Sequence, residues 1–448
     1  MNSVSVVGLG KLGQNLAACF AYRGFQTLGV DLADEVVNAI NRGRRTVDEP
    51  GLQELIDSSG HRLRATTSHA DAIEQTDVTF VLVPSPSDPN GNFSNRYVEL
   101  SLEALGLALR QSSKPYHLFV ISSTVMPGSI GSSLIPLLEH VSDRKLNQGF
   151  GLAYCPEFVA LGNAIKGFLR PDLAVIGESD NRAGELVLAI YHQLCENSPP
   201  MLRMPLINAE IAKVSLNCYV TLKISFANLL ANLCEKIPGA DVDLITEALG
   251  HDRRISPYYF RGGLRAGGTC FPRDIRAFIA FAERYGEDAD MIRAVERIND
   301  YQDDHLVDLV LRHVEAACAD RVSVLGLSFK PDTPVITESP AIHLVIELLA
   351  RGLDVTVYDP MATENARAEL GTRVTYATSA RQCLAAAPVC VIATPWKQFR
   401  ELDETCIERD SVTIVDCWRI LDTQRFGPHV NYRAIGQFGI TSECFTSV

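Results

Sequence analysis

The sequence predicts an α/β protein with two doubly wound, Rossmann-like domains joined by a central helical segment. Near its start, a short apolar run leads at once into a glycine-rich turn and a helical stretch. In its last third, short apolar runs again alternate with helical patterns, which is typical of parallel sheets. A long helical pattern separates the two regions. We therefore expect three parts, over residues 1–205, 206–300 and 301–448.

The composition limits the class of protein. The chain has 448 residues, of which 46% are hydrophobic and 21% charged, so it can bury large cores. Its net charge of -13 argues against nucleic acid or an anionic membrane as a partner. We find no apolar run long enough to span a bilayer. The 12 cysteines are scattered without a Cys-x-x-Cys motif, which predicts reduced thiols, a cytoplasmic protein and no metal site.

The first predicted strand, residues 4–7, runs directly into the turn Gly8-Leu9-Gly10-Lys11-Leu12-Gly13, and a helix over 14–22 follows. Such glycines allow a tight turn and let a pyrophosphate approach the helix N-terminus. The next strand, 27–30, ends in Asp31, which is placed to bind ribose hydroxyls and would repel a 2′-phosphate. We therefore predict an NAD site, although Asp31 is also compatible with a solvated turn.

Later apolar runs predict strands over 78–83, 118–122 and 173–176. Ser85 and Thr124 follow two of these strands, where loops of such sheets face the ligand crevice. The two hydroxyls could contact cofactor or substrate, or could equally serve as helix N-caps.

The central segment begins with a helical pattern over 208–236, followed by a second helix over 242–249. Lys213 and Asn217 are four residues apart and so share one helix face. A lysine beside an amide can stabilise a developing oxyanion, but a solvated polar stripe would look the same. The long apolar helix also offers a surface for dimerisation, so we expect a homodimer.

A loop rich in arginine and glycine leads from these helices to a single cysteine. Clustered arginines, among them Arg254 and Arg261, suit phosphate recognition. The loop ends in Gly267-Gly268-Thr269-Cys270, and Asp274 follows four residues later. Cys270 is a candidate covalent nucleophile, and the alternative is a buried cysteine in a glycine-rich turn.

The last third predicts a strand over 322–326, a helix over 341–350 and strands over 355–359, 389–393 and 412–415. This second domain lacks a complete Gly-x-Gly-x-x-Gly motif, so we expect it to bind something other than a second dinucleotide. Lys330, just after the first of these strands, could hold a phosphate or could be a surface lysine.

In this order, the motifs resemble the UDP-glucose/GDP-mannose dehydrogenase family nearly end to end. The matching segments are 8–13, 123–128, Pro156-Glu157-Phe158, the helix face of Lys213 and Asn217, 267–274, 325–333 and 338–340. The resemblance implies an NAD-binding domain, a central dimerisation segment and a C-terminal domain that binds a nucleotide sugar.

It also implies a four-electron oxidation of a sugar primary alcohol to a carboxylate by two NAD molecules in succession, a step that would serve polysaccharide biosynthesis. Cys270 would form a thiohemiacetal and then a thioester, which water hydrolyses. The implied catalytic residues are Cys270, Lys213, Asn217, Asp274, Glu157 and Thr124. Cofactor contacts are expected from Gly8, Gly10, Lys11, Leu12, Gly13, Asp31, Ser85, Thr124 and Lys330. Substrate contacts are expected from Phe158, Lys213, Asn217, Arg254, Tyr259, Arg261, Gly267, Phe329 and Lys330.

The chain departs from the family pattern at a few positions. Leu161 stands where the family has a second acid, Arg273 replaces a lysine, Arg265 and Ala266 replace a glycine and an aromatic residue, and Thr337 replaces an arginine. We therefore keep UDP-glucose as the default substrate of a dehydrogenase with altered substrate choice, with a UDP-N-acetylhexosamine or GDP-mannose as alternatives.

Two further readings stay open at this point. A two-electron hydroxyacid dehydrogenase would share the N-terminal domain and the Lys/Asn helix, but it needs neither Cys270 nor a third domain. A non-catalytic nucleotide-sugar-binding protein would explain the departures, but not the retention of Cys270, Lys213 and Asp274.

Overall fold

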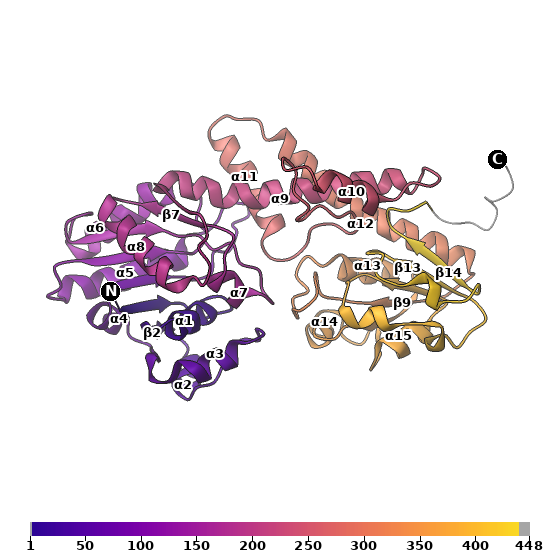
Figure 1. Ribbon diagram of the computed structural model, residues 1–448, viewed down its shortest axis with the longest axis horizontal. Coiled ribbons are helices and arrows are strands. Elements are labelled where there is room, and N and C mark those ends of the chain that lie inside the picture. The colour runs from indigo at the N-terminus through magenta and orange to yellow at the C-terminus, as the bar shows by residue number, and fades with distance from the viewer. Residues whose placement is uncertain (1, 439–448) are drawn as a thin grey trace. The chain divides into compact units, whose positions relative to one another are not determined.

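The computed structural model describes residues 2–438 and divides the chain into two compact units, up to Leu216 and from Asn217. Each unit contains one sheet covered by helices, which confirms the predicted class of two Rossmann-like α/β domains (Figure 1). The boundary falls inside the long helix α9 (Leu206–Cys234) rather than at a loop. The division into three parts stays a prediction.

The first unit has an eight-stranded sheet in the order β3-β2-β1-β4-β5-β6-β7-β8. The strands are β1 (Ser3–Val7), β2 (Gln26–Val30), β3 (Leu63–Thr66), β4 (Val78–Val81), β5 (His117–Ile121), β6 (Phe150–Tyr154), β7 (Ala174–Glu178) and β8 (Met201–Pro205). Neighbours are parallel except β6 and β7. The first six follow the doubly wound order in which ligands bind at the carboxyl ends of the central strands.

Helices cover both faces of this sheet. One apolar core lies under α1 (Gly13–Tyr22), α2 (Asp34–Asn41), α3 (Leu52–Ser59), α7 (Ala164–Leu169) and α8 (Asn181–Leu194). The other lies under α4 (His69–Gln75), α5 (Arg96–Gln111) and α6 (Ile135–Ser142). In α5, Leu102, Leu105 and Leu109 are fully buried because their three- and four-residue spacing places them on one helix face.

The second unit contains a parallel six-stranded sheet in the order β11-β10-β9-β12-β13-β14, the same doubly wound pattern. The strands are β9 (Arg321–Leu325), β10 (Asp354–Tyr358), β11 (Thr375–Tyr376), β12 (Val389–Ile392), β13 (Val412–Asp416) and β14 (Val430–Ala434). Helix α13 (Pro340–Ala350) packs on one face and α15 (Ala380–Ala386) on the other, as Figure 1 shows. Helix α14 (Thr363–Leu370) joins the α13 side.

The remaining helices of this unit are α10 (Val242–Gly250), α11 (Phe271–Arg284) and α12 (Asp290–Ala316). The second half of α9 packs against α12 through buried polar contacts as well as apolar ones. Asn232 Nδ2 donates to Gln302 Oε1 at 3.0 Å, for example. The sequence predicts α9 and α10 but not α12, because the buried stripe of α12 includes the polar residues Asn299, Gln302 and Asp303.

Helix α9 differs from one expectation. By length and composition alone it is apolar enough to cross a membrane, although we had found no such run. Within its most apolar stretch, 44% of the residues are buried inside the protein, and the core helix of a soluble protein passes the same test. The length of α9 is therefore weak support for a membrane span.

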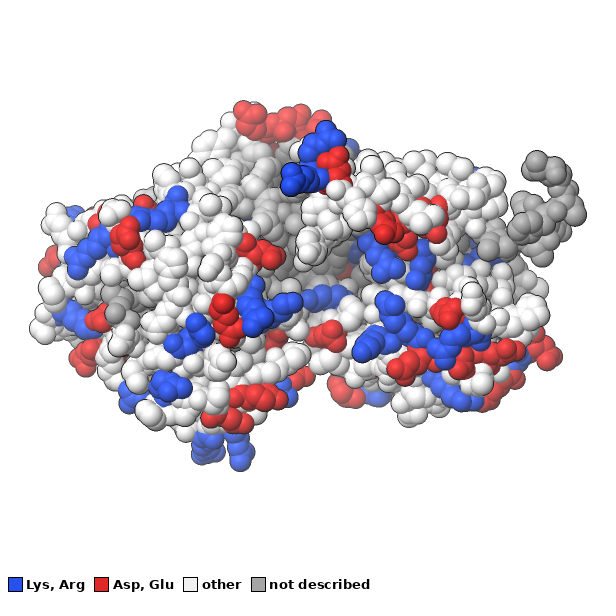
Figure 2. Space-filling view, viewed as in Figure 1, with Lys and Arg blue, Asp and Glu red and all other residues white. Residues whose placement is uncertain are grey.

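The surface carries both signs of charge side by side. On the face shown in Figure 2, Lys and Arg side chains are interspersed with Asp and Glu side chains on both units. The net charge of -13 is therefore spread over the surface rather than separated into large regions of one sign on this face.

Candidate functional site

The three glycines of the first turn are required for different physical reasons. Gly8 has a φ of 91°, and a Cβ there would lie 2.5 Å from the carbonyl oxygen of Leu82. A Cβ on Gly13 would lie 1.7 Å from the carbonyl oxygen of Gly8, so the turn could not close. Around Gly10, by contrast, nothing lies within 4 Å of the Cβ position. This open space lets a ligand approach the backbone directly.

The start of α1 fits a phosphate group. Its N-cap residue, Leu12, makes no side-chain hydrogen bond to the first turn. The first N–H groups of a helix have no intrahelical partner and favour an anion. Lys11 precedes this N-terminus and is exposed. The turn therefore fits the pyrophosphate of a dinucleotide.

Asp31 lies at the end of β2 and holds the glycine turn from the side. Its Oδ2 accepts a hydrogen bond of 2.8 Å from the N–H of Leu9, and its Oδ1 accepts one of 3.0 Å from the N–H of Ala33. Each carboxylate oxygen can accept more than one hydrogen bond, so both can still receive ribose hydroxyls. The glycine turn and Asp31 together form a site that fits NAD.

Ser85 and Thr124 follow β4 and β5, whose carboxyl ends lie at the same edge as the glycine turn. Ser85 is buried and Thr124 half-buried. Between the two strands, the hydroxyl of Ser123 accepts from the N–H of Val83 at 2.8 Å and donates to its carbonyl at 2.9 Å. The structure therefore brings both predicted residues to the expected edge of the sheet.

Lys213 and the Pro-Glu-Phe segment meet within the first unit. Lys213 Nζ donates a hydrogen bond of 2.7 Å to the carbonyl oxygen of Glu157 and lies 4.9 Å from the centre of the Phe158 ring. The side chain of Lys213 is buried. The alternative of a solvated polar stripe therefore does not hold for this residue.

The Glu157 side chain is half-buried, beside Tyr191. Burial raises its pKa to about 8, although the charge of Lys213 and a hydrogen bond from Tyr191 both act to lower it. Tyr191 Oη, on α8, donates to Glu157 Oε1 at 3.4 Å. A carboxyl group with a pKa near neutral pH is suited to general base work. Sequence reasoning missed Tyr191, because a partner 34 residues away leaves no local pattern.

A second buried acid, Glu210, supports the loop that carries Thr124. Its two carboxylate oxygens accept hydrogen bonds of 3.0 Å from the N–H groups of Gly128 and Ile130. Burial raises the pKa of Glu210, against these two hydrogen bonds. Glu210 therefore fixes the loop after β5 to the start of α9.

Cys270 lies in the second unit, at the N-cap position of α11, and its side chain is exposed. Its Sγ is 3.6 Å from the Thr269 hydroxyl. The alternative of a buried structural cysteine is therefore wrong. The N-terminus of a helix stabilises negative charge, which suits a thiolate or an oxyanion formed at this sulfur.

Asp274 lies one turn into α11 and is completely buried. Its Oδ2 accepts from Asn217 Nδ2 at 2.6 Å, and its Oδ1 pairs with the guanidinium of Arg273 at 3.0 Å. Arg273 is one of the departures from the family pattern, and here it neutralises a buried carboxylate.

Gly267 and Gly268 allow close approach of another loop of the same unit. A Cβ on Gly267 would lie 2.4 Å from the carbonyl oxygen of Glu338. On Gly268, whose φ is 85°, it would lie 2.6 Å from the Phe329 ring. These two glycines therefore make room for Glu338 and Phe329, and Lys330 Nζ lies 5.8 Å from the centre of the Phe329 ring.

Arg254 and Tyr259 lie in the exposed loop after α10. Arg254 pairs with the neighbouring Asp252 at 2.6 Å, and its side chain is 87% exposed. Tyr259 is exposed and has a φ of 57°, an uncommon conformation for an aromatic residue. Neither residue contributes to the core of this unit, so both are available to a ligand.

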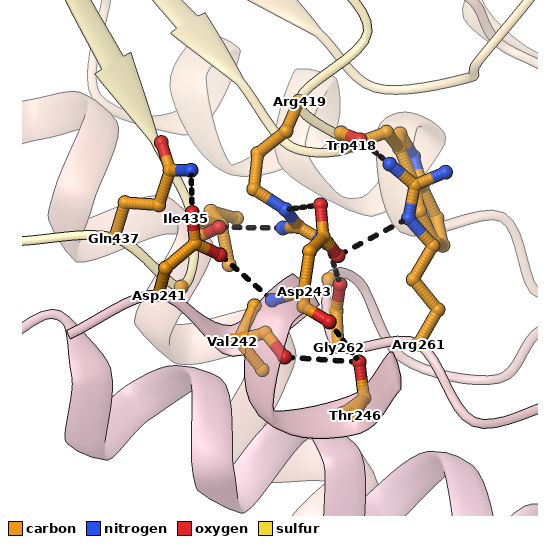
Figure 3. Close-up of polar contacts among 12 residues, drawn as sticks. Asp241, Val242, Asp243, Thr246, Arg261, Gly262, Trp418, Arg419, Ile435 and Gln437 are labelled. Carbon is orange, nitrogen blue, oxygen red and sulfur yellow. Dashed lines mark hydrogen bonds and ion pairs between the residues drawn. The ribbon is translucent and has the colours of Figure 1, made fainter. Parts of the chain in front are cut away.

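Arg261 and Arg419 lie on either side of Asp243, as Figure 3 shows. Arg261 donates to the carbonyl oxygen of Trp418 and lies 3.6 Å from Asp243. The nearly buried Arg419 makes two hydrogen bonds of 2.8 Å to Asp243 and one of 2.7 Å to the carbonyl of Gly262. Burial acts to raise the pKa of Asp243, but the two arginines outweigh it and hold that pKa below its ordinary value.

Sequence reasoning missed Arg419, although its position in the loop after β13 was a usable signal. No group of His, Cys, Asp or Glu residues within 2–438 is arranged to hold a metal ion.

Three family models match the chain in succession. They are the NAD-binding domain, the central domain and the UDP-binding domain of the UDP-glucose/GDP-mannose dehydrogenase family, over residues 2–195, 207–301 and 323–423.

Individual relatives agree with these matches. UDP-glucose 6-dehydrogenase AglM of Haloferax volcanii is 38% identical over 95% of this chain and 98% of its own length. GDP-mannose 6-dehydrogenase of Pseudomonas putida is 34% identical over 80% of each. The solved structure of a UDP-glucose dehydrogenase from Pyrobaculum islandicum has a TM-score of 0.88 and 35% identity, and covers 98% of both chains.

Proposed function

We propose UDP-glucose as the substrate of this chain, which belongs to the UDP-glucose/GDP-mannose dehydrogenase family and is an NAD-dependent nucleotide-sugar 6-dehydrogenase. UDP-glucose 6-dehydrogenase AglM of Haloferax volcanii is 38% identical over 95% of this chain, whereas GDP-mannose 6-dehydrogenase of Pseudomonas putida is 34% identical over 80% of it. The observation that carries the catalytic part of the proposal is Cys270, exposed at the start of α11 one turn before the buried Asp274.

The overall reaction converts a primary alcohol and one water to a carboxylate, with loss of two hydrides and three protons. NAD, when bound, accepts one hydride in each oxidation. The first oxidation gives an aldehyde. The Cys270 sulfur then adds to the aldehyde carbon, and the proton of the resulting thiohemiacetal hydroxyl is lost as the second hydride leaves. The product is a thioester, and attack of water on its carbonyl carbon releases the carboxylate and returns the thiol.

Lys213 and Asn217 are the proposed oxyanion partners. Lys213 is buried and donates a hydrogen bond to the Glu157 carbonyl, which fixes the position of its ammonium group. Asn217 uses its amide to bind Asp274, so its orientation is fixed as well. Preorganised donors of this kind stabilise charge that develops on the substrate oxygen.

Glu157 and Asp274 are the two carboxyl groups proposed to act on protons and water in the site. The raised pKa of Glu157 suits a general base that works near neutral pH. Asp274, one turn from Cys270, would help to position the water that attacks the thioester, and Thr124 would orient it.

Recognition of the ligands is proposed for the residues that the sequence motifs indicate. For NAD these are Gly8, Gly10, Lys11, Leu12, Gly13, Asp31, Ser85 and Thr124, with Lys330 from the second unit. For the nucleotide sugar they are Phe158, Lys213, Asn217, Arg254, Tyr259, Arg261, Gly267, Phe329 and Lys330. The arginines would bind the diphosphate.

The proposal also includes a homodimer. We place the enzyme in the cytoplasm, where it would act in the synthesis of polysaccharide precursors. In the second unit, α9 exposes the apolar side chains of Tyr219, Phe226, Leu229 and Leu233, each more than 40% exposed. Leu229 and Leu233 line a surface groove with Ile298 and Tyr301 of α12. An apolar surface of this kind is typical of a subunit interface. Light scattering on the purified protein checks the mass of the assembly.

The first experiment measures NADH formed per sugar consumed with UDP-glucose, GDP-mannose and UDP-N-acetylhexosamines. We expect two NADH per UDP-glucose, and a preference for another sugar would overturn the substrate assignment. Cys270→Ser should still bind UDP-glucose but should lose turnover to the acid. Steady release of two NADH per sugar by that variant would refute the thioester step.

A further inference from the structure

The carboxylate of Glu338 lies between two arginines of the same unit. Its Oε2 is 3.1 Å from Nη2 of Arg265, and its Oε1 is 3.2 Å from Nη2 of Arg276. Arg265 belongs to the segment that leads to Cys270. Arg276 belongs to helix α11, which begins directly after Cys270. Glu338 therefore holds both sides of the Cys270 turn.

The backbone of Glu338 is itself in a strained conformation, with a φ of 53°. A residue other than glycine keeps such a conformation only where the surrounding structure determines it. Ion pairs on both of its carboxylate oxygens supply that constraint.

Arg265 also reaches helix α12. Its Nε lies 2.6 Å from Oδ2 of Asp303, and only 11% of either side chain is exposed. A single guanidinium therefore neutralises two carboxylates that come from elements 38 and 73 residues away in the chain. Ion pairs in such a shielded place are screened much less by salt than pairs on the surface.

The backbones lie in direct contact at the same place. The N–H of Gly268 donates to the carbonyl of Thr337 at 3.2 Å, and Gly267 has no room for a Cβ against Glu338. The Phe329 ring closes over Gly268. The segment 265–270 therefore packs directly against the loop 329–338.

We propose that Arg265 is a positioning residue, which acts through Glu338 to hold the Cys270 turn in a fixed relation to Phe329 and Lys330. The catalytic part of this inference rests on the proposed function of Cys270. A displaced nucleophile loses rate steeply, and a misplacement of about 1 Å can cost about 10²-fold. Arg265 touches no reacting atom in this account.

The test compares Arg265→Met, which keeps the length of the side chain, with Arg265→Lys, which keeps its charge. The matched control is Arg293→Met, which removes an arginine at the start of α12 that pairs with three carboxylates, Glu283, Asp288 and Asp290. Hydrogen exchange of peptides that cover 265–270 and 329–338 reports directly, without any substrate, how tightly these two segments pack against each other.

In Arg265→Met we expect exchange in both peptides to rise about tenfold, and kcat with UDP-glucose to fall about tenfold to a hundredfold. The dissociation constant for NAD should stay within twofold of its original value. The exchange rates and kcat of Arg265→Lys should lie between those of Arg265→Met and the parent. Arg293→Met should leave exchange in both peptides unchanged. Unchanged exchange in Arg265→Met would overturn the proposal.

A double-mutant cycle with Glu338→Gln isolates the pair. If Arg265 acts through Glu338, the double variant should be little worse than either single variant, in exchange and in kcat. Strictly additive effects would refute the link. Because exchange needs no turnover, inactivity towards every sugar would count against the proposed function while this measurement still decides the role of Arg265.

Discussion

The amide of Asn217 donates a hydrogen bond of 2.6 Å to the carboxylate of Asp274, which is completely buried. The N–H of Asp274 in turn donates to the carbonyl of Cys270 at 2.8 Å. One side chain thus ties helix α9 to the turn that carries the proposed nucleophile. The burial of the carboxylate makes this contact important for stability as well as for geometry.

Removal of this carboxylate should destabilise the protein. Asp274→Ala removes the ion pair with Arg273 and the acceptor for the Asn217 amide, and breaking a buried pair costs about 3–5 kcal/mol. Asp274→Asn keeps an acceptor for Asn217 and should lose less. Urea unfolding checks the order. Asp304→Ala, at an exposed position of α12, is the control and should change the free energy of unfolding by no more than about 0.5 kcal/mol.

The activity should depend on the ionisation of Glu157. If this carboxylate is the base, kcat/KM rises with pH through an apparent pKa near 8, because only the deprotonated form accepts a proton. Glu157→Gln should lose this limb of the profile and about 10²–10⁴-fold of the rate. A profile that is flat from pH 6 to about 9 in the parent enzyme would exclude Glu157 as the base.

Stability should follow the same group with the opposite trend. In the unfolded chain, Glu157 regains its ordinary pKa, so between that value and about 8 the folded state holds a proton that the unfolded state has lost. The contribution of Glu157 to the free energy of unfolding therefore falls as the pH rises through this window. Glu157→Gln should lose that part of the pH dependence, which thermal unfolding across the window measures.

Lys213 should affect both the rate and the pH profile. Loss of its charge in Lys213→Met removes an interaction that lowers the pKa of Glu157, so the limb of the profile should move to higher pH. Loss of an oxyanion donor should also lower kcat by about 10²–10³-fold. Lys213→Arg keeps the charge and should keep the limb near its original position. A limb that stays in place in Lys213→Met would mean that the two groups do not interact electrostatically.

Much of the fold could be predicted because it is encoded in local patterns. The strand, the glycine turn, helix α1 and Asp31 follow one another within 31 residues, and each leaves a signal that the physics of turns and helix ends explains. Strands β9, β12 and β13 are rich in Val, Leu and Ile and almost entirely buried, as expected where both faces of a sheet are covered, whereas burial alternates along β10. Strand β11 has only two residues and left no such run.

The supporting contacts of the candidate site could not be predicted in this way. Glu210 binds the backbone 80 and 82 residues earlier, and Tyr191 reaches a carboxylate 34 residues away. Arg265 could be seen as a departure from the family pattern, but nothing in the sequence around it predicts its ion pair with Glu338. Such contacts depend on how elements pack, and packing between distant segments leaves no periodic trace in the sequence.

Asp31 gives a final prediction, in which structure and binding can be separated. Asp31→Ala removes the proposed ribose acceptor and also the acceptors for the N–H groups of Leu9 and Ala33. We expect the dissociation constant for NAD to rise about tenfold or more, since hydrogen bonds to a charged group contribute about 1.5–3 kcal/mol. Stability should fall by about 1–2 kcal/mol, because the backbone donors lose their partner.

Asp31→Asn separates the two effects. An asparagine keeps an acceptor for one of the two backbone N–H groups but not for the other, and it carries no charge to repel a 2′-phosphate. Stability should therefore fall by less than in Asp31→Ala, while discrimination against NADP weakens. Isothermal titration with NAD and NADP measures both constants on each variant. If the affinity for NAD is unchanged in Asp31→Ala, the ribose is held by another residue and Asp31 serves only to fix the turn. In that outcome the loss of stability would remain, because it follows from the two hydrogen bonds to the backbone and not from the ligand.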